Sequence, residues 1–395
     1  MNARIKLTHV ITALNVGGAE VMLCRMLEKM DRSRFDCSVI CLGPRGVLSE
    51  RIERAGIPLT TLGMRGPFSL LRGLWKMTRL FRREKPGAVH TWMYHGDFMG
   101  GLAAKLGGDP PVAWSIHHTT HAKGGIKWTT RALTWLLARL SHWIPRHIFC
   151  CSHATQREHV RIGYRGDNME VIFNGADLEV CQPSHEARTK LRAELGIPDN
   201  TPLIGAAGRF HPQKDYPNFF EAALLLQETR SDVHFVLCGK GLSADNPEIA
   251  PYLSRSPHPG HFHLLGLRGD MPSVYPALDL FALAAAFGEG WPLTLGEALA
   301  CGVPCVSTDL GDCRDLIGDC GEAVPAKDPA ALAAAWLRVL SLSSEETAAL
   351  KTRCRQRVVD HFNIDDVIRQ YEAAYTRLAS GQASPSAATT AVCKV

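Results

Sequence analysis

Short apolar runs recur along the first half of the chain, and the segments between them carry apolar residues at helical spacing. The runs that predict strands are 6–14, 36–42, 88–92, 112–116 and 147–151. Runs that are apolar on both faces are typical of strands covered by helices on each side, as in a parallel sheet. The pattern therefore predicts an α/β domain over residues 1–180.

The same alternation returns later in the chain, with predicted strands at 203–207, 234–238, 263–265, 280–283 and 304–307. A polar stretch with two prolines precedes it, and we place an interdomain linker there, at 181–201. A chain of 395 residues exceeds what one hydrophobic core normally organises. A second α/β domain is therefore expected at 202–363.

The end of the chain divides into two parts. Apolar residues at helical spacing predict a helix at 364–378, which we expect to cross back to the first domain. Residues 379–395 are mostly small and polar, a composition typical of a disordered tail. The chemistry is therefore expected before residue 364.

The composition is that of an ordinary globular protein, with 46% hydrophobic and 21% charged residues. No apolar run reaches the roughly 18 residues that a membrane-spanning helix needs. The 13 cysteines are scattered without C-x-x-C pairs, and the first residues do not read as an export signal. We therefore expect reduced thiols and a cytoplasmic protein.

The charge is unevenly distributed along the chain. The first 180 residues hold 25 of the 44 Lys and Arg residues but only 14 of the 39 Asp and Glu residues. This basic half is a candidate for an anionic partner. Nucleic acid is not expected, because the chain has no zinc-finger spacing and no recognisable nucleic-acid-reading motif.

Two amphipathic segments of the basic half, 68–83 and 126–144, are rich in both aromatic and basic residues. One interpretation is that they are helices that cover a sheet and expose a solvated basic face. The other is peripheral attachment to an anionic membrane, with Trp75, Trp128 and Trp143 as anchors. The sequence leaves both interpretations open.

Residues 287–304 form the most informative stretch, which reads as a strand end, a glycine-rich loop, a helix and a stop. Pro292 suits a first helical turn, and Gly302 suits a helix end. This geometry leaves Glu289 in the loop and Glu297 in the helix. Backbone amides near Trp291 to Leu293 would then face a ligand and hold its hydroxyl or phosphate oxygens.

Two further loops follow predicted strands. Residues 208–215 read Gly-Arg-Phe-His-Pro-Gln-Lys-Asp and place two cations, Arg209 and Lys214, after a strand of the second domain. Residues 15–20 read Asn-Val-Gly-Gly-Ala-Glu, where the small size of Gly17 and Gly18 allows close approach to a ligand.

Together these residues resemble the large family 4 of retaining glycosyltransferases. Glu289 and Glu297 match its E-x7-E motif, and residues 208–214 match its G-R-x-x-x-x-K motif. The resemblance covers nearly the whole chain and implies the GT-B fold, two Rossmann-like parallel-sheet domains that face across a cleft. It implies that Glu289 contacts the donor sugar near its reacting face and that Glu297 binds the ribose hydroxyls.

The resemblance also implies roles for the remaining candidates. Arg209 and Lys214 would hold the diphosphate and stabilise the charge that develops on it as the glycosidic bond breaks, so no metal is required. Gly17 and Gly18 would reach the diphosphate when the domains close. His117 would lie near the primary hydroxyl of the sugar or the reacting bond, although the adjacent His118 leaves the register open by one residue.

The implied sites comprise two sets. The catalytic set is Glu289, His117, Arg209 and Lys214. The donor-binding set is Gly17, Gly18, Arg209, Lys214, Gly239, Leu265, Glu289, Gly290, Trp291, Pro292, Leu293 and Glu297. Gly239 would line the nucleotide pocket, and the backbone around Leu265 would meet the nucleobase.

The implied activity is transfer of a sugar, with retention, from a nucleotide diphosphate sugar to a hydroxyl of a glycan or lipid-linked acceptor. UDP is the favoured nucleotide, with GDP and ADP open, and no cofactor is expected. The setting would be cell-surface polysaccharide biosynthesis at the cytoplasmic face of the inner membrane. Front-face attack assisted by the leaving phosphate is preferred over a double displacement with Glu289 as nucleophile.

Other functions stay open at this point. A sugar-nucleotide epimerase of the same fold would need no acceptor, and a non-catalytic relative would only bind the nucleotide sugar. Residues 239–244 formally match G-x-G-x-x-A, which raises a dehydrogenase alternative. That match is weak because the acidic residue expected about 20 positions on is missing and Pro247 interrupts the following helix.

Overall fold

A computed structural model describes residues 4–119 and 128–382. Most of the predicted tail, from residue 383 on, lies outside the described residues, as do residues 126 and 127 of the second amphipathic segment. The chain divides into two compact units. The first holds the residues up to Asn174 together with those from Asp365 on, and the second is Gly175–Ile364.

The first unit is built, in its described residues, on a seven-stranded parallel sheet in the order β3-β2-β1-β4-β5-β6-β7. Its strands are β1 (Ile5–Ile11), β2 (Phe35–Cys41), β3 (Leu59–Thr61), β4 (Ala88–Trp92), β5 (Val112–Ile116), β6 (His147–Cys150) and β7 (Met169–Val171). Its helices are α1 (Gly18–Lys29), α2 (Ser49–Arg54), α3 (Pro67–Glu84), α4 (Met93–Leu106), α5 (Trp128–Leu140), α6 (His153–Arg161) and α15 (Ile364–Ala379).

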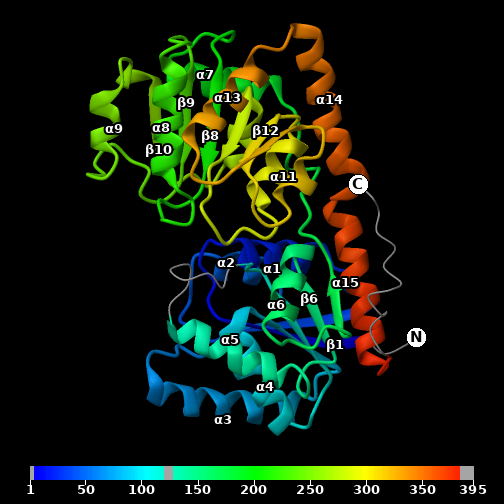
Figure 1. Cartoon of the computed structure of the whole chain (residues 1–395). Helices are drawn as coiled ribbons and strands as arrows, with labels where there is room; N and C mark the ends of the chain where they lie inside the picture. The colour runs from blue at the N-terminus through cyan, green and yellow to red at the C-terminus, as the bar shows by residue number, and fades with distance from the viewer. Residues whose placement is uncertain (1–3, 120–127, 383–395) are drawn as a thin grey trace. The chain divides into compact units, whose positions relative to one another are not determined.

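Side chains alternate across this sheet, so each strand contributes to two cores. Val10, Val89 and Trp114 belong to one core with residues of α3, α4 and α5. On the other face, rings of His9 and His90 meet the α15 ring of Tyr375. Figure 1 shows α15 beside the strands of the first unit and α4 packed against both α3 and α5.

The second unit is built on a six-stranded parallel sheet in the order β10-β9-β8-β11-β12-β13. Its strands are β8 (Leu203–Ala207), β9 (His234–Cys238), β10 (Phe262–Gly266), β11 (Leu280–Leu283), β12 (Cys305–Thr308) and β13 (Gly321–Val324). Its helices are α7 (His185–Leu195), α8 (Tyr216–Gln227), α9 (Ala250–Arg255), η1 (Pro259–His261), α10 (Met271–Val274), η2 (Tyr275–Ala277), α11 (Leu293–Ala300), α12 (Cys313–Ile317), α13 (Pro329–Leu340) and α14 (Ser344–His361).

The predicted α/β fold with two parallel sheets is confirmed. Residues 181–201, however, fold as part of the second unit rather than as a separate linker. Within them, α7 is anchored by the buried Arg192, whose guanidinium donates to the Asp279 carboxylate at 2.6 Å and to the Ala277 carbonyl at 3.0 Å. Polarity and prolines suggested a linker, but a buried arginine with partners in sequence-distant residues makes this segment part of a core.

The strand order reverses at β1 and β4 in the first sheet and at β8 and β11 in the second. Ligands of open parallel sheets bind beyond the carboxyl ends of the strands at such a reversal. The loops after β8 and β11 are therefore where the second unit is expected to hold a ligand. Within the described residues, no helix combines the length and the apolar character needed to cross a bilayer.

Candidate functional site

The loop after β8 lies directly against the loop after β9. The Gly208 amide donates to the Cys238 carbonyl at 2.9 Å, and the Phe210 amide donates to the Lys240 carbonyl at 2.8 Å. Gly239 has φ of +153°, and a Cβ added there would lie 1.9 Å from the Gly208 oxygen. Only glycine fits at this position, so Gly239 acts by letting the two loops touch.

An ion pair joins the loops after β8 and β11 at the reversal of strand order. The Lys214 ammonium lies 2.8 Å from the Glu289 Oε1, and the Gln213 side-chain amide donates to the same oxygen at 3.3 Å. The Ala286 amide also donates to the Gln213 carbonyl at 2.8 Å, which joins the two backbones. The structure thus places two residues of the predicted site, Lys214 and Glu289, in direct contact.

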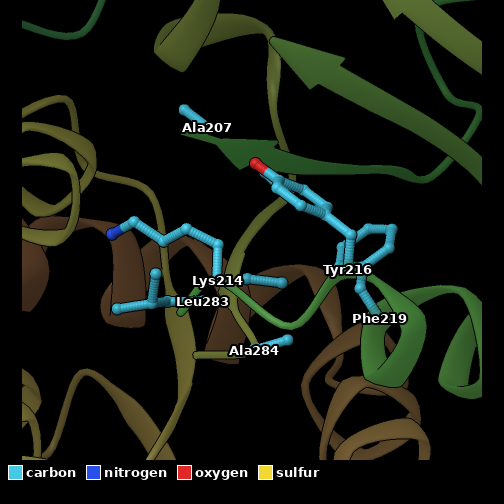
Figure 2. Close-up of a pocket in the computed structure, with 8 residues that line it drawn as sticks. Ala207, Lys214, Tyr216, Phe219, Leu283 and Ala284 are labelled. Carbon is cyan, nitrogen blue, oxygen red and sulfur yellow. The ribbon is translucent and has the colours of Figure 1, made fainter. Parts of the chain in front are cut away.

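A small cavity lined in part by Lys214 lies between the ends of β8 and β11. Its volume of about 10 Å³ has room for roughly one water. Figure 2 shows the Lys214 side chain extending away from the Tyr216 ring on the other side of this cavity. The Tyr216 hydroxyl donates to the Gly208 carbonyl at 2.9 Å. The cavity is too small for a sugar, so a ligand would meet the ammonium end of Lys214 rather than this cavity.

Glu297 is held by a phenol. The Tyr275 hydroxyl donates to the Glu297 Oε2 at 2.7 Å, and both side chains are buried. Burial, followed by the nearby Glu297 carboxyl, raises the pKa of Tyr275 well above its usual value, so the phenol keeps its proton. Glu289 contacts a cation and Glu297 contacts a phenol, which gives the two carboxylates different environments. They do not resemble a paired acid and base.

The loop between the two glutamates is shaped by a glycine far along the chain. A Cβ on Gly311 would lie 2.1 Å from the Glu289 carbonyl oxygen, and the Asp312 amide donates to the Gly290 carbonyl at 3.1 Å. The Trp291 ring is buried 5.1 Å from the Phe362 ring. The Trp291 side chain therefore packs in the interior. Its predicted contact with the nucleotide sugar would have to come from its backbone.

The remaining predicted residues of the second unit lie on the same edge of the sheet. Arg209 is exposed on the loop that carries Lys214. Leu265 lies in β10, next to its last residue, Gly266, whose carbonyl accepts a hydrogen bond from the Gly239 amide at 2.7 Å. Pro292 is the N-cap of α11, which begins at Leu293. The second unit thus collects the predicted donor-binding residues at the carboxyl ends of its strands.

Gly17, Gly18 and His117 belong to the first unit. Gly17 is the N-cap of α1, and Gly18 is the first residue of that helix. His117 follows β5, and its ring stacks on the Trp92 ring with centroids 5.3 Å apart and 11° between planes. Burial lowers the pKa of His117 to about 4, so the imidazole is neutral at physiological pH.

Sequence reasoning missed Gln213, Tyr275 and Gly311. Gln213 lies inside a motif that was already singled out, so its position next to Lys214 was a usable signal. Tyr275 and Gly311 reach the site through tertiary contacts that no local pattern reveals. Among the residues described, no group of three or more His, Cys, Asp or Glu side chains is placed to hold a metal ion.

The chain is similar to glycosyltransferases in sequence. Residues 16–180 match the family described as Glycosyltransferase Family 4, and residues 201–342 match Glycosyl transferases group 1. The UDP-Gal:alpha-D-GlcNAc-diphosphoundecaprenol alpha-1,3-galactosyltransferase of Escherichia coli is 26% identical over 371 residues, 92% of this chain and 94% of the relative. The mannosyltransferase LpsB of Rhizobium meliloti is 27% identical over 53% of this chain and 60% of the relative.

Solved structures show the same fold. The crystal structure of Anabaena HepE in complex with UDP has a TM-score of 0.82 at 20% identity and covers 94% of this chain and 100% of that one. The galactosyltransferase WaaB has a TM-score of 0.70 at 16% identity, with 94% and 99% covered. The predicted GT-B fold is confirmed by these likenesses.

Proposed function

The chain belongs to the family 4 glycosyltransferases, and from this premise we propose that it moves a sugar, with retention, from a UDP-sugar to a hydroxyl of a lipid-linked glycan. The observation that carries the proposal is the Lys214–Glu289 ion pair at the reversal of strand order, which is 2.8 Å long, on a loop that also carries the exposed Arg209. Lys214 and Arg209 would bind the diphosphate of the donor, and the Glu289 carboxylate would bind a hydroxyl of its sugar.

The cations account for the driving force of the reaction. Cleavage of the glycosidic bond leaves negative charge on the terminal phosphate of the nucleotide, and Lys214 and Arg209 stabilise that charge more than they stabilise the bound donor. Lys214 already balances Glu289, so its ammonium is held in place before the donor binds. UDP is favoured because the Escherichia coli relative is named for UDP-Gal and because Anabaena HepE was crystallised with UDP and with UDP-glucose.

Retention follows from attack on the same face as the leaving group, with a phosphate oxygen taking the acceptor proton. The alternative, a covalent sugar on Glu289, needs a free carboxylate oxygen as nucleophile. In this structure Glu289 Oε1 accepts hydrogen bonds from Lys214 and Gln213, which weakens that oxygen as a nucleophile. The alpha-1,3 linkage named for the Escherichia coli relative is what retention produces from an alpha-linked donor.

Two measurements test this proposal. Thermal unfolding with UDP, GDP, ADP and NAD is expected to show the largest stabilisation by UDP, because a ligand that binds the folded state raises its melting temperature. NMR of the product from a UDP-sugar and a glycan acceptor is expected to show the donor's anomeric configuration. Inversion, or stabilisation by NAD alone, would contradict it, and donor isomerisation without acceptor would indicate an epimerase.

A lipid-linked acceptor places the reaction at a membrane surface, and α3 and α5 have the side chains for such a contact. Trp75 of α3 is 59% exposed, and Trp128 and Trp135 of α5 are 78% and 57% exposed. Trp135 and Trp143, which follows α5, line a groove of about 580 Å³. We infer that this surface, together with its arginines and lysines, rests on the anionic cytoplasmic face of a membrane.

Co-sedimentation with vesicles tests the membrane contact. Binding is expected to phosphatidylglycerol vesicles, to weaken as salt is raised, and to fall when Trp135 and Trp143 are both changed to Ser. The matched control is Leu267→Ser, which removes a 68% exposed apolar side chain from the second unit. Equal binding to neutral phosphatidylcholine vesicles, or no binding at all, would contradict an electrostatic contact.

A further inference from the structure

The loop after β8, which carries the two predicted cations of the donor site, contains a β-turn. The Lys214 amide donates to the His211 carbonyl at 2.8 Å, which closes a turn with Pro212 at its second position. The residue before the turn is also held, because the Phe210 ring stacks on Tyr216 with centroids 5.7 Å apart. The first residue of the turn, His211, therefore lies on a backbone that is fixed on both sides.

The imidazole of His211 caps this turn. The Gln213 backbone amide donates to the His211 Nδ1 at 3.2 Å. A backbone N–H can only donate, so the direction of this hydrogen bond is fixed. The ring nitrogen that accepts must be bare, and a neutral imidazole with a bare Nδ1 carries its proton on Nε2.

The nitrogen of His211 that carries the proton is open to a ligand. His211 is exposed, and among the described residues no group hydrogen-bonds to its Nε2. Partial desolvation by the surrounding protein, followed by the nearby Arg209 guanidinium, lowers the pKa of His211 below its usual value, so the ring is neutral at physiological pH. The loop thus offers a neutral N–H donor in addition to the charged groups of Arg209 and Lys214.

A turn of this kind does not by itself require a histidine. Asn, Asp and Ser are the residues that usually stand at its first position, because their short side chains accept from the amide two residues on. Histidine fulfils the same role with Nδ1 and adds a second polar group, Nε2–H, on the far side of the ring. A contact between that group and a ligand can therefore be separated from support of the turn.

We propose that the Nε2–H of His211 donates a hydrogen bond to a phosphate oxygen of the bound nucleotide sugar. Phosphate oxygens are strong acceptors, and an N–H that is held in place before binding loses little entropy when the bond forms. Because charge builds on the diphosphate as the glycosidic bond breaks, this hydrogen bond strengthens in the transition state. The proposal rests on the proposed glycosyltransferase function for its ligand, whereas the tautomer of His211 does not depend on that function.

Substitution by asparagine separates the two roles of His211. Asparagine can still accept from the Gln213 amide, so His211→Asn keeps the turn and removes only the outward N–H. The affinity of the full chain for UDP, measured by calorimetric titration at pH 7.5, is expected to fall about 10-fold, the value of one hydrogen bond to a charged group. The matched control is His185→Asn, which changes an exposed histidine at the start of α7 and should bind UDP like the wild type.

Nitrogen-15 NMR of the histidine rings gives a second readout, which a purely structural role would not change. The free chain is expected to show a bare Nδ1 and a protonated Nε2 for His211, with the signals assigned from His211→Asn. Saturating UDP is expected to shift the Nε2 signal and to slow the exchange of its proton with water, while the Nδ1 signal changes little.

Each failure has a separate meaning. An affinity for UDP that His211→Asn leaves unchanged, or an Nε2 that does not respond to UDP, would overturn the proposal. So would a bare Nε2 in the free chain, or an equal loss of affinity in His185→Asn. A wild type that binds UDP through His211 but transfers no sugar would instead contradict the proposed glycosyltransferase function and leave this phosphate contact standing.

Discussion

Lys214 has two tasks that a substitution can separate. Its ammonium balances the buried Glu289 in the folded chain, and in the proposed reaction it stabilises the leaving phosphate. Lys214→Met is therefore expected to lower donor hydrolysis about 100-fold or more. It should also lower the free energy of unfolding by roughly 1–3 kcal/mol, because Glu289 loses a charged partner.

The double variant Lys214→Met with Glu289→Gln isolates these two effects. It removes the charge of the carboxylate that has lost its ammonium partner, so urea unfolding should recover much of the lost stability while hydrolysis stays low. Recovery of activity together with stability would show that Lys214 acts only as a structural partner of Glu289.

The pH dependence of stability is set by histidines that the fold keeps neutral. Burial lowers the pKa of His9 from its ordinary value of 6.5 to about 3 and that of His117 to about 4. Below pH 6.5 the unfolded chain therefore binds protons that the folded chain does not. The free energy of unfolding should fall as pH drops from about 6.5 to 4, by about 1.4 kcal/mol per pH unit for each such histidine.

Urea unfolding of the wild type and of His9→Gln at several pH values between 7 and 4 checks this dependence. The variant should start less stable, because the Trp92 indole loses its acceptor, His9 Nδ1, at 3.2 Å. Its stability should then fall less steeply with acid. Identical slopes for the two chains would show that His9 is not neutral in the folded state.

At the scale of loops and elements, the contact between the β8 and β9 loops depends on a missing side chain. Gly239→Ala would force a Cβ to within 1.9 Å of the Gly208 oxygen at a φ of +153°. The loop that carries Arg209 and Lys214 must then shift, so the variant should lose roughly 1–3 kcal/mol of stability and most of its affinity for UDP. Thermal unfolding and UDP titration measure both effects.

Gly260→Ala is the matched control, because a Cβ there meets nothing within 4 Å. Its stability should change by less than about 0.5 kcal/mol, and its UDP affinity should stay that of the wild type. If Gly239→Ala binds UDP as tightly as this control, the close approach of the two loops does not shape the nucleotide site.

How completely a strand is buried explains which strands the sequence predicted and which it did not. Central strands such as β4 and β11 are buried along their whole length, so they appear as continuous apolar runs. The edge strands β3, β7 and β13 are short and half-exposed, and their residues lack such a run. Glu289 and Lys214 were predicted from local motifs, whereas Tyr275 reaches Glu297 through the fold alone.

At the scale of the whole molecule, the first unit needs the end of the chain. α15 places Tyr371 and Tyr375 against the sheet, both almost completely buried. Glu372 accepts a hydrogen bond from the Asp31 amide at 2.8 Å and pairs with Arg34 at 3.1 Å. Arg377 pairs with Glu170 at 2.9 Å. A segment distant in sequence thus completes the core over β1, β4 and β6.

A chain that ends at Ile364 tests this dependence. Each fully buried aromatic ring contributes about 1.5–3 kcal/mol, so loss of Tyr371, Tyr375 and the Glu372 contacts approaches the 5–15 kcal/mol that stabilises a typical domain. Hydrogen exchange should therefore accelerate in the peptides of β1, β4 and β6. Peptides of β8 to β13 should keep their protection, because Gly175–Ile364 forms its own compact unit. A chain that ends at Gln382 is the control and should exchange like the full chain in both units. Protection of β1, β4 and β6 in the shorter chain would mean that the first unit folds without α15.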